Sequence, residues 1–146
     1  MKNNYKGLRI ITAFFLIIAL AAPVSAAEAT HPVMPLASSY LTSYNTYICD
    51  MGNGEFQIWF TVVGTGTMDE IGTLSIQLYE VKSDGSLKWI DTFLHEDNPS
   101  MLRYNYHVNS SYVSFQGSSS KTYKAYVCIW AGKNGNGDTR YMWALE

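Results

Sequence analysis

The sequence predicts an all-β fold, an antiparallel β-sandwich of about eight strands preceded by a signal peptide. Apolar and polar residues alternate along several short segments, which is the period of a half-buried strand. Clusters of Gly, Asn, Asp and Pro separate these segments, and no helical periodicity follows the first 26 residues. A small β-barrel is the alternative, because barrels use the same alternating strands and tight turns.

The first 26 residues have the parts of a secretory signal peptide. Lys2, Lys6 and Arg9 make the start positive, residues 10–22 form an apolar run, and residues 24–26 are small. The run is shorter than the roughly 20 apolar residues of a membrane span, so we expect cleavage rather than anchoring. The mature protein is therefore expected to be secreted and extracellular, with no membrane span.

Three segments make up the expected organisation: a signal peptide (1–26), a disordered leader (27–38) and the β-sandwich domain (39–146). The leader is rich in Ala, Pro and Thr and has little periodicity. Cleavage after Ala29 fits nearly as well as cleavage after Ala26, so the sequence leaves both sites open.

Four strands are expected in the first half of the domain. Residues 39–51 are rich in Tyr, Thr and Ile and end at Gly-Asn-Gly, which favours a hairpin because Asn-Gly tolerates positive φ. Residues 55–63 place Phe, Ile, Phe and Val on one face, and a Gly-Thr repeat then interrupts them. Residues 71–81 alternate again, and a Ser-Asp-Gly turn leads to residues 87–94.

Four more strands are expected in the second half. Residues 102–108 alternate after a polar loop, and an Asn-Ser turn separates them from a short strand at 112–115. Residues 122–131 are the strongest β sequence of the chain. A Gly- and Asn-rich turn precedes residues 139–145, which close the domain.

A late segment, Tyr-Lys-Ala-Tyr-Val, begins at Tyr123 just after a Gly-Ser loop, and its Tyr126 stands two residues before Cys128. This segment resembles the tyrosine strand of fibronectin-III and immunoglobulin-like domains. The resemblance implies that one tyrosine bonds back to the preceding loop. We favour Tyr123 for this role, because it shares a strand face with the apolar residues at 125, 127 and 129. Cys49 departs from the immunoglobulin pattern, since it lies on the first expected strand.

A second resemblance covers most of residues 38–145. The segments 64–72, 83–85 and 131–133 resemble a group of small secreted proteins from Gram-positive, often gut-dwelling, bacteria. The resemblance implies secretion and a compact β domain. It transfers no catalytic residue to this chain.

Charge and cysteine content limit which partners and which covalent chemistry we expect. Three of the ten basic residues lie in the predicted signal, which leaves seven against twelve acidic residues and a net charge of −5. Nucleic acid and anionic lipid are therefore not expected partners. Cys49 and Cys128 have two interpretations, two free thiols or a disulfide closing a loop of about 80 residues worth about 4 kcal/mol.

Motifs for metal, cofactor or covalent chemistry are incomplete. His95-Glu96 begins like a zinc-protease motif, but Pro99 occupies the place of the second histidine. The Asn-Gly-Asn-Gly-Asp turn resembles a calcium loop but has Gly132 and Trp143 where carboxylate ligands are needed. We therefore predict no catalytic residue, no metal site and no cofactor.

Aromatic residues on the last two expected strands are the candidate binding site. If these strands pair, the rings align on one face, where they could stack on sugar rings or dock a protein. The alternative is that these rings belong to the core. The candidate residues are Tyr126, Trp130, Tyr141 and Trp143. A second tyrosine cluster has the same two interpretations and comprises Tyr40, Tyr44 and Tyr47.

Three functions follow from these observations, in order of preference. The first is a secreted, non-enzymatic binding module for a glycan or a cell-surface protein. The second is a self-associating structural or matrix protein, because tyrosine-rich strands of low charge pair readily at their edges. The third is a small hydrolase, for which Asp69, Glu70 and His95 are the residues to suspect.

Overall fold

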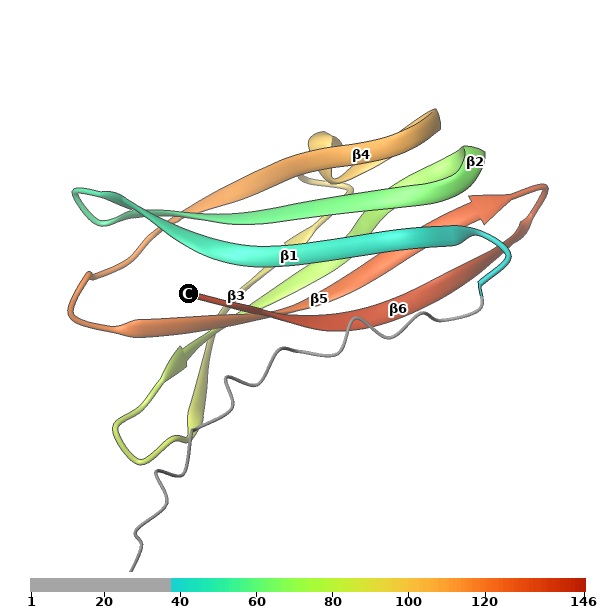
Figure 1. Cartoon of the computed structure of the whole chain (residues 1–146). Helices are drawn as coiled ribbons and strands as arrows, with labels where there is room; N and C mark the ends of the chain where they lie inside the picture. The colour runs from blue at the N-terminus through green and yellow to red at the C-terminus, as the bar shows by residue number, and fades with distance from the viewer. Residues whose placement is uncertain (1–37) are drawn as a thin grey trace, which may run out of the picture. The chain divides into compact units, whose positions relative to one another are not determined.

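The computed structural model describes residues 38–146, so the predicted signal peptide and nearly all of the predicted leader lie outside the described residues. The described chain is all-β and antiparallel, which confirms the predicted fold class. One turn of 3₁₀ helix, η1 (Pro99–Met101), interrupts six strands (Figure 1), which are β1 (Leu41–Gly52), β2 (Glu55–Val81), β3 (Leu87–Leu94), β4 (Leu102–Gln116), β5 (Thr122–Lys133) and β6 (Asn136–Leu145).

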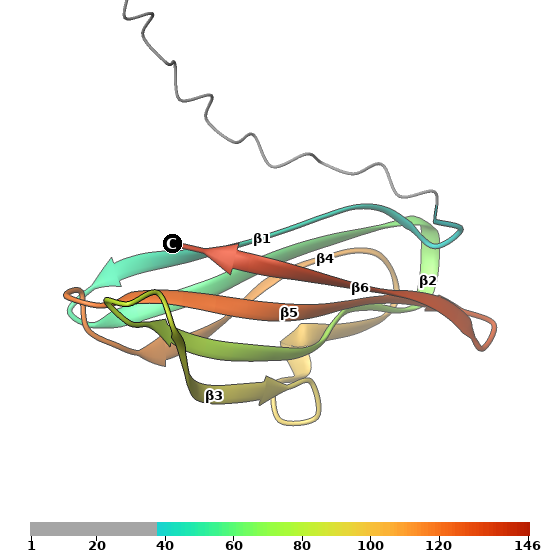
Figure 2. The ribbon, with the colours of Figure 1, turned by 90° about the horizontal axis from the view of Figure 1, so that it is seen from below.

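Strand β2 is long enough to belong to two layers. Residues 55–63 of β2 pair with β1 on one side and β4 on the other. Residues 75–81 pair with β3 on one side and β5 on the other, and β6 pairs with β5. The two layers are thus one hydrogen-bonded sheet that curls like half a barrel, with β1 lying beside β6 (Figures 1 and 2).

Six strands replace the predicted eight because β2 and β4 each continue through a position where a break was expected. The Gly-Thr repeat at 64–67 stays extended and turns β2 from one layer into the other. The expected turn at Asn109 is also wrong, because Asn109 is a fully buried residue inside β4. A glycine inside a strand often marks a bend, so the Gly-Thr repeat by itself does not show whether the strand ends there.

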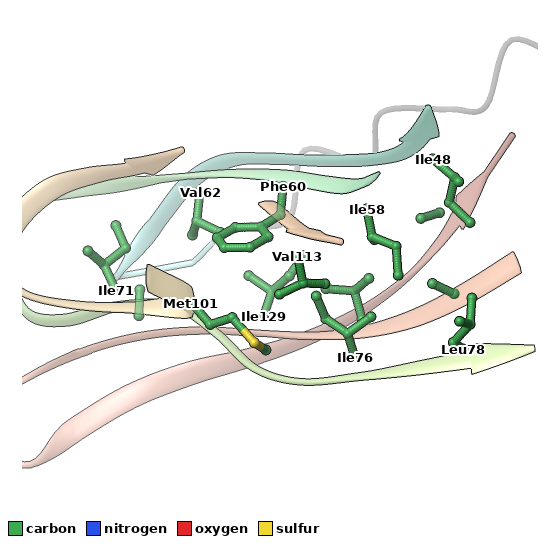
Figure 3. Close-up of a cluster of buried hydrophobic side chains, with 14 of the residues drawn as sticks. Ile48, Ile58, Phe60, Val62, Ile71, Ile76, Leu78, Met101, Val113 and Ile129 are labelled. Carbon is green, nitrogen blue, oxygen red and sulfur yellow. The ribbon is translucent and has the colours of Figure 1, made fainter. Parts of the chain in front are cut away.

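The core lies between the layers and is mainly aliphatic (Figure 3). Strand β2 lines it from both halves, with Phe60 and Val62 from one layer and Ile76 and Leu78 from the other. Alternate residues of β5 face the same core. The predicted period-two alternation is therefore confirmed, but all four tryptophans lie outside this cluster of buried residues.

The short connections follow the expected chemistry. Asn53 and Gly54 both have positive φ in the β1–β2 hairpin, as a type I′ turn requires. The Tyr123 hydroxyl accepts a hydrogen bond from the Ser118 backbone N–H at 2.9 Å, which is the bond to the preceding loop that the resemblance implies. Within residues 38–146, no helix is long and apolar enough to span a membrane.

Candidate functional site

The first layer consists of β1, the first half of β2 and β4, and the second layer consists of the second half of β2, β3, β5 and β6. The outer surface of the second layer carries a group of exposed and half-buried aromatic side chains. We call it the aromatic face. It forms because the inward residues of β5 are buried, so the residues between them point outward. The strand register then places Trp143 opposite Tyr126 and Trp89 opposite Tyr79. Its residues are Tyr79, Trp89, Tyr126, Trp130, Tyr141 and Trp143.

Tyr126 is the centre of this face. Its ring is stacked on Tyr141, with 5.5 Å between centroids and 11° between planes. It also contacts Trp143 at 4.9 Å, and Trp143 in turn lies 5.8 Å from Tyr79. Tyr141 is 59% exposed and Trp143 is 42% exposed. Three of the four predicted residues thus form one continuous contact surface, held by cross-strand ring pairs.

Trp130, the fourth predicted residue, lies further along the same face and has a different environment. Its indole N–H donates to Glu70 Oε2 at 2.9 Å. A Cβ atom placed on Gly132 or Gly137 would come within 2.6 Å or 2.4 Å of the ring. The indole therefore occupies the space that two missing side chains leave, and the hydrogen bond fixes its orientation.

A hollow of about 370 Å³ opens beside Trp130, and we call it the Trp130 hollow. It forms where three strands meet, because Glu70 of β2 pairs with both Tyr104 of β4 and Gly132 of β5. Its lining combines two aromatic rings, two carboxylates, one ammonium group and glycine backbone. The lining residues are Asp69, Glu70, Tyr104, Trp130, Gly132, Lys133, Gly135 and Asn136.

The two carboxylates of this hollow are each tied to the protein through one oxygen. Glu70 accepts the indole N–H of Trp130, and Asp69 Oδ2 accepts the backbone N–H of Asn134 at 2.6 Å. A carboxylate has two oxygens, so each group keeps a second acceptor for a ligand. The arrangement can therefore accept hydrogen bonds from a ligand that lies against an aromatic ring.

The residues suspected for hydrolysis are divided between two hollows. Asp69 and Glu70 line the Trp130 hollow, whereas His95 lines a second hollow of about 270 Å³. Tyr104 lines both. The imidazole Nε2 of His95 lies 3.3 Å from the carboxylate of its neighbour Glu96. The structure thus pairs His95 with Glu96 and places the suspected acids in the other hollow.

Asp138, the acid at the end of the Asn-Gly-Asn-Gly-Asp turn, contacts Ser38 and Arg140. Its carboxylate accepts a hydrogen bond from Ser38 and lies 3.7 Å from the Arg140 guanidinium. Among residues 38–146, no group of three His, Cys, Asp or Glu side chains is placed to hold a metal ion.

The disulfide alternative is wrong for this structure, in which both cysteines are free thiols. Cys49 lies opposite Gln57 in one layer, and Cys128 lies opposite Ser75 and Tyr141 in the other. Each thiol follows a buried residue and points to the outer side of its own strand, so the two do not converge. Burial raises the pKa of the Cys128 thiol, which disfavours a nucleophilic thiolate.

The second tyrosine cluster is divided by the fold. Tyr40 and Tyr44 pack against the core, whereas Tyr47 lies on the outer surface of the first layer. There Tyr47 is stacked on Trp59 at 6.4 Å, and Trp59 contacts Tyr112 at 4.7 Å. The molecule therefore carries a second, shorter aromatic row on its other layer.

Sequence reasoning missed several members of the candidate site. Tyr79 and Trp89 belong to the aromatic face, and Tyr104 belongs to the hollow. One signal was present: Trp130 is followed two residues later by a glycine on the same strand face. An aromatic ring commonly covers a glycine in a sheet, which indicates an ordered rather than a mobile indole.

No protein-family model matches the chain, and the search of curated proteins finds no match.

Proposed function

We propose that this protein is a secreted, non-enzymatic binding module whose binding surface is the aromatic face. The observation that carries the proposal is the contiguous ring cluster of Tyr126, Tyr141 and Trp143, in which the two β6 rings are exposed. Contiguous apolar surface of this kind marks interaction sites on soluble proteins. Tyr and Trp are also the residues that contribute most to binding energy at interfaces.

The arrangement favours binding over packing for a physical reason. Aromatic side chains bury about 150–250 Å² each when they enter a core, yet these rings lie on the far side of β5 and β6 from the core cluster. Cross-strand pairs hold them in place, so little side-chain freedom remains to be lost on binding. A flat ligand face then gains contact with little entropy cost from ordering these side chains.

The test compares matched pairs of substitutions on the two layers. We expect the Tyr141→Ala/Trp143→Ala variant to bind at least 10-fold more weakly to whatever the wild type selects from arrays of glycans and cell-surface proteins. The control is Tyr47→Ala/Tyr112→Ala, which removes two exposed rings from the other layer. Equal loss in both variants, or no selected ligand for the wild type, would contradict the proposal.

Extracellular location is part of the same proposal, and the positive, apolar and small segments of residues 1–26 support it. Expression of the full chain with intact-mass analysis of the medium tests it. We expect a secreted product that lacks the first 26 or 29 residues. Retention of the full-length chain in the cells would count against secretion.

Self-association is the second candidate, and strand β3 is the observation that favours it. Within the described residues β3 pairs only with β2, so its other edge is open. Leu87, Trp89 and Leu94 of β3 are exposed, and open edges of this kind can pair with a second chain. Sedimentation analysis over a wide concentration range would show a mass increase if this function holds and a constant monomer mass if it does not.

A further inference from the structure

The Trp130 hollow lies at one end of the aromatic face, and its chemistry narrows the class of ligand. We propose that this hollow is a subsite for one ring of a neutral glycan, with the chain continuing along the aromatic face. The inference rests on the proposed function, because it assigns a ligand class to the same surface. It is argued from the platform, the hydrogen-bonding groups and the continuity of the surface.

The platform is the indole of Trp130. One side of the ring covers the glycine backbone at Gly132 and Gly137, and its N–H is bonded to Glu70. These contacts fix the position of the indole, and Trp130 is one of the residues that line the hollow. A pyranose ring has an apolar face of C–H groups, which packs on an aromatic ring as other apolar groups do.

The hydrogen-bonding groups match hydroxyls. Glu70 and Asp69 each keep one acceptor oxygen, and Lys133 supplies donors. Asn136 donates to the Asn134 carbonyl, so its own amide oxygen stays available as a further acceptor. A ligand must then offer several donors and at least one acceptor beside an apolar face. Sugar hydroxyls are both donors and acceptors, and a sugar ring presents them around its edge.

Charge separates a neutral glycan from other polar ligands. Two carboxylates and one ammonium group line the hollow, so acidic sugars meet net repulsion. A small organic cation would suit the carboxylates and rings of the hollow alone. Such a cation would not contact the rest of the aromatic face. The observations therefore favour a ligand made of several linked sugar rings.

The aromatic face is continuous with the hollow along strand β5. Trp130, Cys128 and Tyr126 point to the same side, and at about 3.3 Å per residue the first and last are about 13 Å apart. Tyr141 lies opposite Cys128 and stacks on Tyr126. The next outward-facing residue pair after Trp130 therefore already carries an aromatic ring. A single sugar ring is shorter than this span, which suits an oligosaccharide.

The experiment follows the four tryptophan indole N–H signals by heteronuclear NMR during titration. The probes are neutral oligosaccharides (gluco-, manno-, xylo- and chito-oligomers), an oligogalacturonate as the anionic probe and choline as the cationic probe. We expect a neutral oligosaccharide to shift the Trp130 and Trp143 signals while the Trp59 signal, on the other layer, stays in place. Saturation by choline or oligogalacturonate in preference to every neutral oligomer would overturn the inference.

Two variants separate this inference from the proposed function. Glu70→Gln keeps an acceptor for the indole N–H but removes the charge, and we expect at least 5-fold weaker binding of the selected oligosaccharide with an unchanged Trp130 signal in the free protein. Thr67→Ala, an exposed change on the same strand outside the hollow, is the control.

If Tyr141→Ala/Trp143→Ala abolishes binding while Glu70→Gln has no effect, the aromatic face binds the ligand and the proposal of a subsite in the hollow is wrong. If the face selects only a protein, the proposed function holds and the glycan inference fails; if nothing is selected, both fail.

Discussion

At the scale of single residues, Gly72 leaves less room for a side chain than any other glycine in residues 38–146. Its φ of +148° and its closeness to the Met101 carbonyl leave no room for a side chain, because a Cβ there would lie 2.0 Å from that oxygen. Beside it, the buried Asn109 amide donates to the carbonyls of Met101 and Ile71 at 3.0 and 3.2 Å. These contacts fasten β4 and η1 to the segment of β2 that pairs with both β4 and β5.

We expect Gly72→Ala to destabilise the fold by about 3 kcal/mol or more, because the Met101 backbone must move and the φ angle is unfavourable for alanine. Urea unfolding measures the change. The matched control is Gly66→Ala, since a Cβ on Gly66 has no atom within 4 Å. The control should change stability by less than about 0.5 kcal/mol, and equal effects would contradict the steric explanation.

Tyr123 and Tyr126 allow a second prediction at this scale. By sequence, either of them could form the hydrogen bond from the strand back to the preceding loop. Tyr123→Phe should cost about 1 kcal/mol in unfolding free energy, since it removes the acceptor of the Ser118 N–H. Tyr126→Phe keeps the outward ring and should leave stability nearly unchanged. Thermal melts of the two variants decide the matter, and a larger loss for Tyr126→Phe would assign the role to the other tyrosine.

At the scale of elements, Glu80 connects the end of β2 to the start of β5. Its carboxylate binds the Lys82 ammonium at 2.7 Å and the Lys121 ammonium at 3.0 Å. Hydrogen bonds and charge attraction from these two lysines hold the pKa of Glu80 at about 2, below its usual 4.5. Glu80 itself is buried while both lysines reach solvent. Two ion pairs therefore hold the end of β2 to the residue that precedes β5.

This lowered pKa predicts an acid-dependent loss of stability. The folded state favours the charged carboxylate, so the stabilisation is complete above about pH 4.5 and is lost as pH falls from there toward 2. Urea unfolding between pH 2 and pH 6 should show this decline in the wild type. Glu80→Gln should be less stable at pH 6 and should show a shallower decline, whereas parallel pH profiles would contradict the assignment.

At the scale of the whole molecule, one core joins both layers through β2. Residues from both halves of β2 and from β1, β4 and β5 belong to the same buried cluster. Because no boundary divides this core, we expect a chain comprising residues 38–146 to unfold in a single cooperative transition. Coincident denaturation curves from tryptophan fluorescence and far-ultraviolet circular dichroism would confirm it, and two separated transitions would show that the layers fold independently.

The two layers also give the molecule two unlike outer surfaces. The second layer carries the aromatic face and the Trp130 hollow, and the first carries the row of Tyr47, Trp59 and Tyr112. The sequence reasoning could identify which residues are aromatic and which strands hold them. It could not decide whether the aromatic residues of β5 belong to the core, since the alternate residues on both sides of that strand are mostly apolar or aromatic.

Features that depend on neighbouring residues were determined by the sequence alone. Alternation placed the strand segments, and Asn-Gly pairs placed the β1–β2 and β5–β6 hairpins. Tyr123 was assigned from the apolar residues on its own strand face. Each of these rests on local geometry. The tertiary structure decided what depends on distant partners. It made one strand of 55–81, put Asn109 in the core, and joined Trp130 to Glu70, 60 residues away. Such contacts are selected by the packing of the whole chain, and no local pattern encodes them.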